Sequence, residues 1–407
     1  MSVLRAVPAK ARRIFLLDSS SGIFHGIYMG GIIPFLGVIA RGELGASPLL
    51  IAVISAAPFA GYLASPYFAR RLERGGKKVA LVVLSSLGGR AAFVLLALVH
   101  SSVGLTAVAG AAMLIPAFCM PAYTALLKDI YPDEWRGRLT SLSRVGVNFA
   151  ALAASAVVGV LLARWSFRVV LPLVALFTMI GPIVLFSRIP EPKPTATPPE
   201  LQARGSLSVL SEDPLYVKYL LAFFLASFGG LMYAPLIPIL QVDQLHITTD
   251  WVGMLGTVSA LFAGLSFYLW GKMIDARGAV ACALVFALGW AAAAIGYAAV
   301  PSLPWLIPLA VVTGLAGSAR ELAMVNAVMQ FADQERIPRY SSVLYTSVGI
   351  SGLAAPLCGA LLATVLPVRT VFWLCGGVVL LGFLLMLQVM KEKQWEEQRR
   401  NEVPAYE

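Results

Sequence analysis

The stretch Ile189-Pro-Glu-Pro-Lys-Pro-Thr-Ala-Thr-Pro-Pro-Glu200 interrupts an otherwise apolar chain near its middle. Its prolines favour an extended, semi-rigid connector. Polar residues continue to position 214, so the segment 189–214 is too polar to cross a membrane, whereas long apolar runs flank it on both sides. The stretch therefore predicts a linker between two halves, 1–188 and 215–390, and a charged tail follows at 391–407.

The composition excludes a soluble protein. Of the 407 residues, 59% are hydrophobic and 13% are charged, whereas a soluble domain carries about 25% charged residues. The net charge of +10 is first explained by membrane topology, so nucleic acid is not an expected partner. The chain is predicted to be a polytopic protein embedded in a lipid bilayer.

The apolar runs predict an all-α membrane protein with twelve transmembrane helices in two six-helix bundles. A helix needs about 20 apolar residues to cross a membrane, whereas a β-barrel would show alternating segments of about ten residues. The runs here are long and continuous. The expected spans are 14–40, 46–69, 79–99, 103–126, 140–164, 167–188, 215–242, 248–270, 279–299, 303–330, 339–366 and 368–390.

The basic residues predict the orientation of these spans. The N-terminus, the even-numbered loops and the C-terminal tail hold 24 of the 31 Lys and Arg residues. Because cytoplasmic loops carry an excess of positive charge, both termini are expected in the cytoplasm. The expected location is the plasma membrane, which in a bacterium is the inner membrane.

The two halves also repeat each other. Gly159-Val-Leu-Leu-Ala163 closes span 5, and Gly359-Ala-Leu-Leu-Ala363 closes span 11, 200 residues later. An internal repeat of six plus six spans, related by a pseudo-twofold axis, is a transporter architecture.

The segment after span 8 reads Gly271-Lys-Met-Ile-Asp275-Ala-Arg277-Gly278. It resembles the signature loop of the major facilitator superfamily, roughly Gly-x-Leu-Ala-Asp-Arg-x-Gly-Arg-Lys. The corresponding segment of the first half, from Pro66 to Lys78, keeps the basic residues and glycines but has Arg70 where the acid belongs. With the topology and the linker, this resemblance implies two bundles that move a solute by alternating access.

The resemblance also implies that these loops act as latches. Charges in a short loop can pair with the opposite half and with helix dipoles, although the same charges could merely stop the helices from sliding into lipid. The expected gating residues are Asp275, Arg277, Gly271, Gly278, Arg70, Arg71, Lys77, Lys78, Asp129 and Arg136.

Two patterns of the family's proton antiporters are missing. Span 4 has no arginine followed by Gln and Gly, and span 5 lacks a Gly-Pro pair. The nearest match to the second pattern, Gly352-Leu-Ala-Ala-Pro356-Leu-Cys-Gly359, lies in span 11. These departures argue against a standard multidrug antiporter.

Charged residues inside a span are costly and point to function. Span 10 carries Arg320 and Glu321, and the resemblance places that helix beside the substrate cavity. Glu321 is expected to carry a coupling proton, while Arg320 holds an anionic substrate group or neutralises Glu321. The alternative is a static ion pair.

Span 1 carries Asp18 and His25, which are seven residues apart and share one helix face. Histidine titrates near physiological pH, so both residues are candidates for coupling, although Asp18 could cap a helix and His25 could simply pack. Arg90 in span 3 is expected to brace helices by pairing with Asp18 or Glu321, whereas Arg144, near the end of span 5, is expected to snorkel or to belong to a gate.

Polar groups that could complete the cavity are Tyr123, Tyr233 and Asn326, together with Asn148 and Tyr345. The alternative interpretation is that each of these side chains forms a hydrogen bond between helices and does not contact the solute.

No motif of an enzyme or an ATP-driven pump is present in the sequence: there is no phosphate-binding loop, no HExxH and no activated nucleophile. The four cysteines lie in apolar runs without CxxC spacing, so neither a metal nor a cofactor is expected. We expect a monomeric secondary active transporter of a small organic solute, anionic or zwitterionic, that is driven by a proton gradient. The alternatives are an uncoupled facilitator or lipid flippase of the same fold, and a membrane sensor or scaffold that transports nothing.

Overall fold

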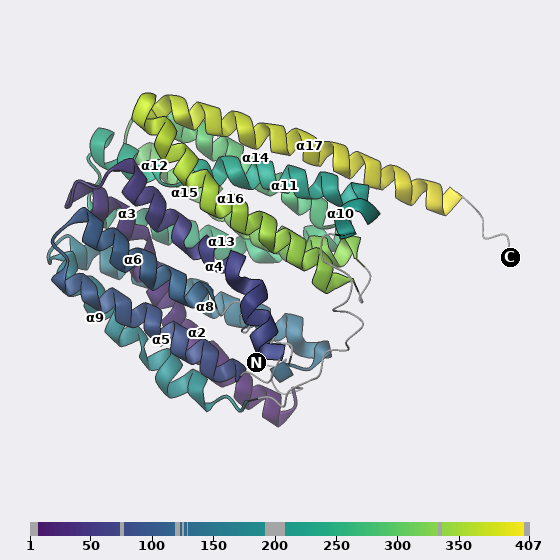
Figure 1. Cartoon of the computed structure of the whole chain (residues 1–407), viewed down its shortest axis with the longest axis horizontal. Helices are drawn as coiled ribbons and strands as arrows, with labels where there is room; N and C mark the ends of the chain where they lie inside the picture. The colour runs from purple at the N-terminus through teal and green to yellow at the C-terminus, as the bar shows by residue number, and fades with distance from the viewer. Residues whose placement is uncertain are drawn as a thin grey trace.

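The structure is a computed structural model that describes residues 7–73, 77–118, 123, 126–127, 129–191, 208–332 and 336–402. Within these residues every regular element is a helix. Figure 1 shows long helices that run side by side, with both termini toward the same end of the bundle. We call this end the terminal end and the opposite end the distal end.

The first half consists of six crossings, of which the first is broken into two helices. Its helices are α2 (Ala9–Gly31), α3 (Ile33–Gly42), α4 (Pro48–Glu73), α5 (Lys78–Val94), α6 (Ser102–Ala117), α8 (Asp133–Leu162) and α9 (Phe167–Thr178).

The second half repeats this order after a one-turn helix. Its helices are α10 (Val209–Glu212), α11 (Pro214–Tyr233), α12 (Leu236–Ile239), α13 (Thr249–Arg277), α14 (Ala279–Ala299), α15 (Leu306–Phe331), α16 (Ile337–Val365) and α17 (Val368–Glu402).

The twelve expected spans correspond to apolar helices. In the described part of the chain, ten helices are long and apolar enough to cross a membrane, and Pro48–Leu63 and Ser102–Ala117 are two shorter apolar ones. Most of the expected linker, 189–214, lies outside the described residues. The expected charged tail, 391–407, begins as a continuation of the last membrane helix, because α17 extends to Glu402.

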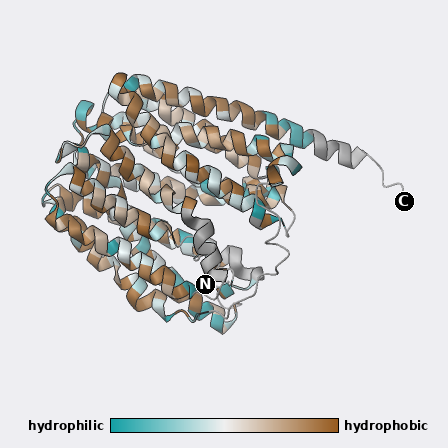
Figure 2. Cartoon of the chain, in the orientation of Figure 1, coloured by the Kyte–Doolittle hydropathy of each residue, from teal (hydrophilic) through white to brown (hydrophobic). Residues whose placement is uncertain are grey.

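The surface of the bundle fits a lipid environment. Figure 2 shows hydrophobic residues along the helices and hydrophilic residues gathered toward their ends. Large apolar side chains such as Leu84 and Leu173 are 67% and 58% exposed. Exposed apolar side chains on this scale match a protein that faces lipid rather than water.

The internal repeat is visible in the breaks of the first crossing of each half. Pro34 lies in the first turn of α3, and Pro235, 201 residues later, precedes α12. A proline lacks the N–H group that would continue the preceding helix. Both crossings are therefore broken at the same place, toward the distal end.

Two arginines show the same repeat in their contacts. Arg168 donates from Nε to the carbonyl oxygen of Val99 at 2.7 Å, and Arg369 donates from Nη2 to that of Val300 at 2.9 Å. Each arginine begins the last crossing of its half and holds the end of the third crossing. The matching contacts show that the halves are built on one plan.

Glycines allow the first crossing to lie directly against α8. Gly22, Gly26 and Gly30 are spaced four residues apart and so share one face of α2. A Cβ atom at Gly26 would lie 2.2 Å from the carbonyl oxygen of Val147, and one at Gly30 would lie 2.0 Å from that of Ala151. Small residues are what permit such backbone contact between membrane helices, and this packing fixes where the polar residues of α2 point.

Candidate functional site

The two halves are held together at the distal end by an ion pair. Arg41, at the end of α3, donates from Nη2 to Oδ2 of Asp243 at 2.6 Å and from Nε to Oδ1 at 2.9 Å. Its Nη1 atom also donates to the carbonyl oxygen of Ala46 at 2.9 Å, which orients the guanidinium. The two side chains are 28% and 36% exposed.

Beside this pair, α8 and α13 cross at small residues. The Ser155 hydroxyl donates to the carbonyl oxygen of Gly253 at 3.1 Å, and the Thr257 hydroxyl donates to that of Leu152 at 3.2 Å. A Cβ atom at Gly253 would lie 2.5 Å from the carbonyl oxygen of Ser155. The halves are therefore in backbone contact near the distal end.

A second ion pair joins the halves nearer the terminal end. Arg144 of α8 places Nη1 2.5 Å from Oε1 of Glu321 of α15, and the two side chains are 49% and 41% exposed. The charges of both residues also act on Tyr62 and Tyr345. These tyrosine rings, from α4 and α16, stack across the same interface with their centroids 6.1 Å apart.

This pairing corrects one expectation. Neutralisation of Glu321 by its neighbour Arg320 was one of two expected roles of that arginine, but the ion-pair partner of Glu321 is Arg144 of the other half. Arg144 was expected to snorkel or to belong to a gate, and its contact with the opposite half is compatible with a gate, which stays a prediction. Adjacent residues on a helix point about 100° apart, and so Arg320 and Glu321 face different surroundings.

Arg320 points into the second half, where aromatic rings surround it. Its Cζ atom lies 5.4 Å from the ring centroid of Trp290, 5.7 Å from that of Phe223 and 6.0 Å from that of Phe286. Its Nε atom donates to the Ser227 hydroxyl at 3.4 Å. A guanidinium over aromatic faces is stabilised by cation–π attraction, so here the rings take the place of a carboxylate.

Arg90 is likewise stabilised without an acid. It is 4% exposed, its guanidinium lies 5.0 Å from the centroid of the Tyr28 ring, and Nη1 donates to the carbonyl oxygen of Ser86 at 3.0 Å. The expected pairing with Asp18 or Glu321 is wrong. Arg90 does join two helices, because Tyr28 belongs to α2 and Arg90 to α5.

Asp18 is buried within the first half and is held by tyrosines. It is 3% exposed and accepts hydrogen bonds from the hydroxyls of Tyr131 at 2.8 Å and Tyr123 at 3.4 Å. Burial and the nearby Asp18 carboxylate raise the pKa of Tyr131, so its hydroxyl remains protonated and able to donate. Tyr123 thus contacts the acid and not the cavity.

His25 lies on the open side of α2. Its side chain is exposed, and its ring stacks on Tyr28 with centroids 5.9 Å apart. Met29, one turn later on the same face, lines the cavity described below. His25 therefore lies on the face of α2 that reaches the cavity at Met29, but it is not itself one of the lining residues.

Two of the expected cavity residues lie elsewhere. Tyr233 is 4% exposed and packs its ring against Tyr297 and Phe372. Asn326 donates from Nδ2 to the carbonyl oxygen of Leu322 in its own helix at 2.8 Å.

The second signature segment is helical rather than a loop. Gly271, Asp275 and Arg277 lie in the last turns of α13, which ends at Gly278 with φ +79°. Asp275 and Arg277 line a cavity of 760 Å³ enclosed by described residues of the second half alone. A latch from these residues to the first half stays a prediction for another conformation.

In the first half, two of the expected gating residues form an ion pair with each other. Lys78 lies 2.5 Å from Asp129, within one half, and Lys77 precedes the first turn of α5. Arg70 and Arg71 belong to α4 and Arg136 to α8, but their side chains lie outside the described residues.

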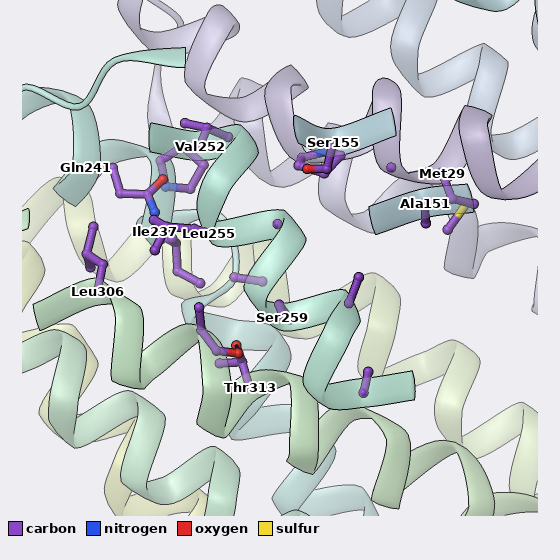
Figure 3. Close-up of a pocket in the computed structure, with 18 of the residues that line it drawn as sticks. Met29, Ala151, Ser155, Ile237, Gln241, Val252, Leu255, Ser259, Leu306 and Thr313 are labelled. Atoms are coloured by element: carbon purple, nitrogen blue, oxygen red, sulfur yellow. Dashed lines mark hydrogen bonds between the residues drawn. The ribbon is translucent and has the colours of Figure 1, made fainter. Parts of the chain in front are cut away.

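A cavity of 440 Å³ lies between the halves toward the distal end. Figure 3 shows Met29, Ala151 and Ser155 of the first half facing Leu255 and Thr313 of the second. Among the described residues, no cluster of three or more His, Cys, Asp or Glu side chains could hold a metal ion. The interface thus combines an apolar cavity with charged pairs on either side.

Several of these residues escaped prediction from sequence. Arg41 did give a signal in the sequence, because it is one of only four basic residues in the loops predicted to be external. Asp243 gave no signal, because its partner is 202 positions away. Gln241, which lines the cavity, resembles any polar residue near a helix end.

Comparisons with known proteins agree with this architecture. The sequence profile of the family described as Major Facilitator Superfamily matches residues 19–248 and 219–405. Multidrug resistance protein MdtG of Serratia proteamaculans (strain 568) is 28% identical over 198 residues, 47% of each chain. Multidrug resistance protein MdtG of Citrobacter koseri is 30% identical over 184 residues, 42% of this chain and 43% of the relative. The chain thus spans less than half the length of these relatives.

Solved structures share the fold over nearly the whole chain. A bacterial homologue of the human lysosomal transporter Spinster, in an inward-facing and unoccupied conformation, superposes with a TM-score of 0.70 at 14% identity, covering 95% of this chain and 98% of that one. The nucleoside transporter NupG (D323A mutant) gives a TM-score of 0.71 at 13% identity, with 92% and 99% covered.

Proposed function

Because the chain belongs to the Major Facilitator Superfamily, we propose that it is a secondary transporter that moves a small organic solute across a bacterial inner membrane. The two halves alternate between states open to either side, and a proton gradient drives the cycle. The solved transporters of this fold and the relatives named as multidrug resistance proteins support transport as the activity. The missing antiporter patterns in spans 4 and 5 leave the direction of transport outside the proposal.

The ion pair between Arg144 and Glu321 carries the proposal of proton coupling. In this pair the carboxylate of Glu321, an acid inside a membrane-spanning helix, contacts the guanidinium of Arg144 in the opposite half. Because both side chains are more than two-fifths exposed, water and protons can reach Glu321. An exposed pair contributes only about 0–1 kcal/mol, so the halves can separate once it is broken.

Protonation links the pair to the conformational cycle. A proton on Glu321 removes the negative charge and weakens the contact with Arg144. A proton then favours whichever state lacks this contact, since a ligand shifts an equilibrium toward the state that binds it better. His25 and the buried Asp18 are the further titratable groups of α2 in this proposal.

The proposed orientation places both termini in the cytoplasm. The distal end, closed by Arg41 with Asp243 and by the α8–α13 crossing, then faces outward. On this proposal the conformation described above has its outer gate shut.

Uptake into proteoliposomes tests the coupling. A radiolabelled solute is first chosen by a thermal-shift screen of the purified protein against metabolites and drugs. We expect Glu321→Gln to abolish accumulation driven by a pH gradient while leaving counterflow, because exchange needs no net proton movement. Glu392→Gln is the matched control, because Glu392 lies 2.7 Å from Lys218 within one half, with similar exposure.

Each other outcome identifies an alternative. Transport that is unchanged by Glu321→Gln and by collapse of the pH gradient contradicts the coupling and indicates a facilitator. Saturable binding without any transport indicates a sensor.

A further inference from the structure

The cavity between the halves has a lining without charge. Nineteen of the residues that the structure describes surround its 440 Å³, and none of them is Asp, Glu, Lys, Arg or His. A charged group that packs against this lining exchanges water for uncharged side chains without gaining a counterion, which is unfavourable. The lining therefore selects against an ionised solute.

One buried amide in this lining lacks a partner. Gln241 is 8% exposed, and the described residues offer its side chain no hydrogen bond, whereas Ser155 and Thr313 donate to backbone carbonyl oxygens. The remaining exposed surface of Gln241 borders the cavity. Figure 3 shows its carboxamide close to Val252 and Ile237, at the apolar wall.

The Gln241 amide is not completely buried, because neither of its polar atoms is among the described side-chain atoms that are both buried and without a partner. Its free hydrogen-bonding capacity is therefore directed at the cavity, where water meets it in the absence of a ligand. A ligand with a hydrogen-bonding group at this point would replace that water. The size agrees with such a ligand, because cavities that bind organic molecules measure about 300–1,000 Å³.

The arginines inside the spans do not alter this chemistry. Arg90 lies under Tyr28 and Arg320 lies among Trp290, Phe223 and Phe286, so their charges are already stabilised. Neither borders the cavity. The expectation of an anionic solute depended on these two arginines.

We propose that the cavity binds an uncharged, mainly apolar organic molecule that has one hydrogen-bonding group paired with the Gln241 amide. That this molecule is the transported solute rests on the proposed transport function. Binding itself does not depend on it. The apolar body fills the space between Met29 and Leu255, and the polar group faces Gln241.

Two dyes with the same ring skeleton test the inference. N-phenyl-1-naphthylamine is neutral and carries one N–H donor, and 8-anilino-1-naphthalenesulfonate adds a negative charge. Equilibrium dialysis of the purified full chain in detergent measures both. We expect saturable binding of the neutral dye and binding of the sulfonate that is at least about tenfold weaker, because the charge would enter an apolar site.

Three variants locate the site. Gln241→Leu is expected to weaken binding of the neutral dye by about fivefold, as befits one lost hydrogen bond. Ala310→Trp fills the cavity and is expected to abolish saturable binding. Asn326→Leu removes an amide that bonds only within its own helix and is expected to bind like the original protein. Melting curves show that each variant is folded.

The inference is overturned if the sulfonate binds as tightly as the neutral dye, if the neutral dye shows no saturable binding, or if folded Gln241→Leu binds it unchanged. Because dialysis uses no gradient, normal dye binding without transport contradicts only the proposed function. Transport with charged solutes and no dye binding contradicts only this inference.

Discussion

Arg41 and Asp243 form a two-point ion pair that joins the first crossing of one half to the first crossing of the other, with contacts of 2.6 and 2.9 Å. Two parallel N–H···O bonds fix the geometry more strictly than a single contact. The pair lies at the distal end, where α8 and α13 of the two halves are also in backbone contact. This ion pair therefore stabilises the closed side of the interface.

Removing the ion pair between Arg41 and Asp243 is expected to open the distal end. For Asp243→Asn, spin labels placed on the two halves should show a population of longer distal distances that rises by up to about fivefold, since an exposed pair is worth up to about 1 kcal/mol. The exchange Arg41→Asp with Asp243→Arg should restore the original distances. Lys218→Ala, which breaks a pair inside one half, is the control.

The crossing of α8 and α13 depends on the absence of a side chain at Gly253. Gly253→Val should prevent closure, because a Cβ atom there would already lie 2.5 Å from the carbonyl oxygen of Ser155. Cysteine cross-linking between Leu152→Cys and Thr257→Cys measures the effect, and we expect at least about a fivefold slower reaction, as for an overpacked contact costing 1–3 kcal/mol. Gly110→Ala meets no atom within 4 Å and should cross-link normally.

Arg144 and Glu321 should act as one unit. Arg144→Gln and Glu321→Gln are each expected to shift the distances between the halves near the terminal end, and the double variant should shift them no further, because each change removes the same contact. Additive shifts would mean that the two residues act independently. Spin-label distances in the purified protein give this result without a transported solute.

The buried Asp18 should contribute to the stability of the first half. Tyr131→Phe removes a 2.8 Å hydrogen bond to its carboxylate, whereas Tyr123→Phe removes one of 3.4 Å. We expect the first variant to lose about 1.5–3 kcal/mol, the usual range for bonds to a charged group, and the second to lose less. Thermal melting in detergent measures both, and an equal loss would contradict the assignment.

The helical spans and their grouping were predictable because they depend on local composition. Continuous apolar runs predicted the crossings, which correspond to ten long and two shorter apolar helices among the described residues. The linker at the prolines after Ile189 stays a prediction, because most of it lies outside those residues. The ends of the helices were less predictable. Gly271–Arg277 carries charges typical of a loop, yet the helix continues until Gly278 adopts a positive φ.

The candidate site was predictable only as a set of residue types. A charge inside a span needs stabilisation, so Glu321, Arg320, Asp18 and Arg90 stood out from their positions alone. Their partners did not, because a guanidinium can be stabilised by aromatic rings as well as by an acid. Arg320 lies over Trp290 and Arg90 over Tyr28, and neither choice can be read from the chain.

The sequence by itself determined that this chain crosses a membrane in two repeated sets of helices, since the transfer of apolar residues into lipid depends on each segment alone. The tertiary structure decided which residues meet across the interface. Arg41 pairs with Asp243 and Arg144 with Glu321 at separations of 202 and 177 residues. Such contacts depend on how two helices cross and rotate, which is set by the packing of small residues such as Gly253 against Ser155 and by no property of either segment alone.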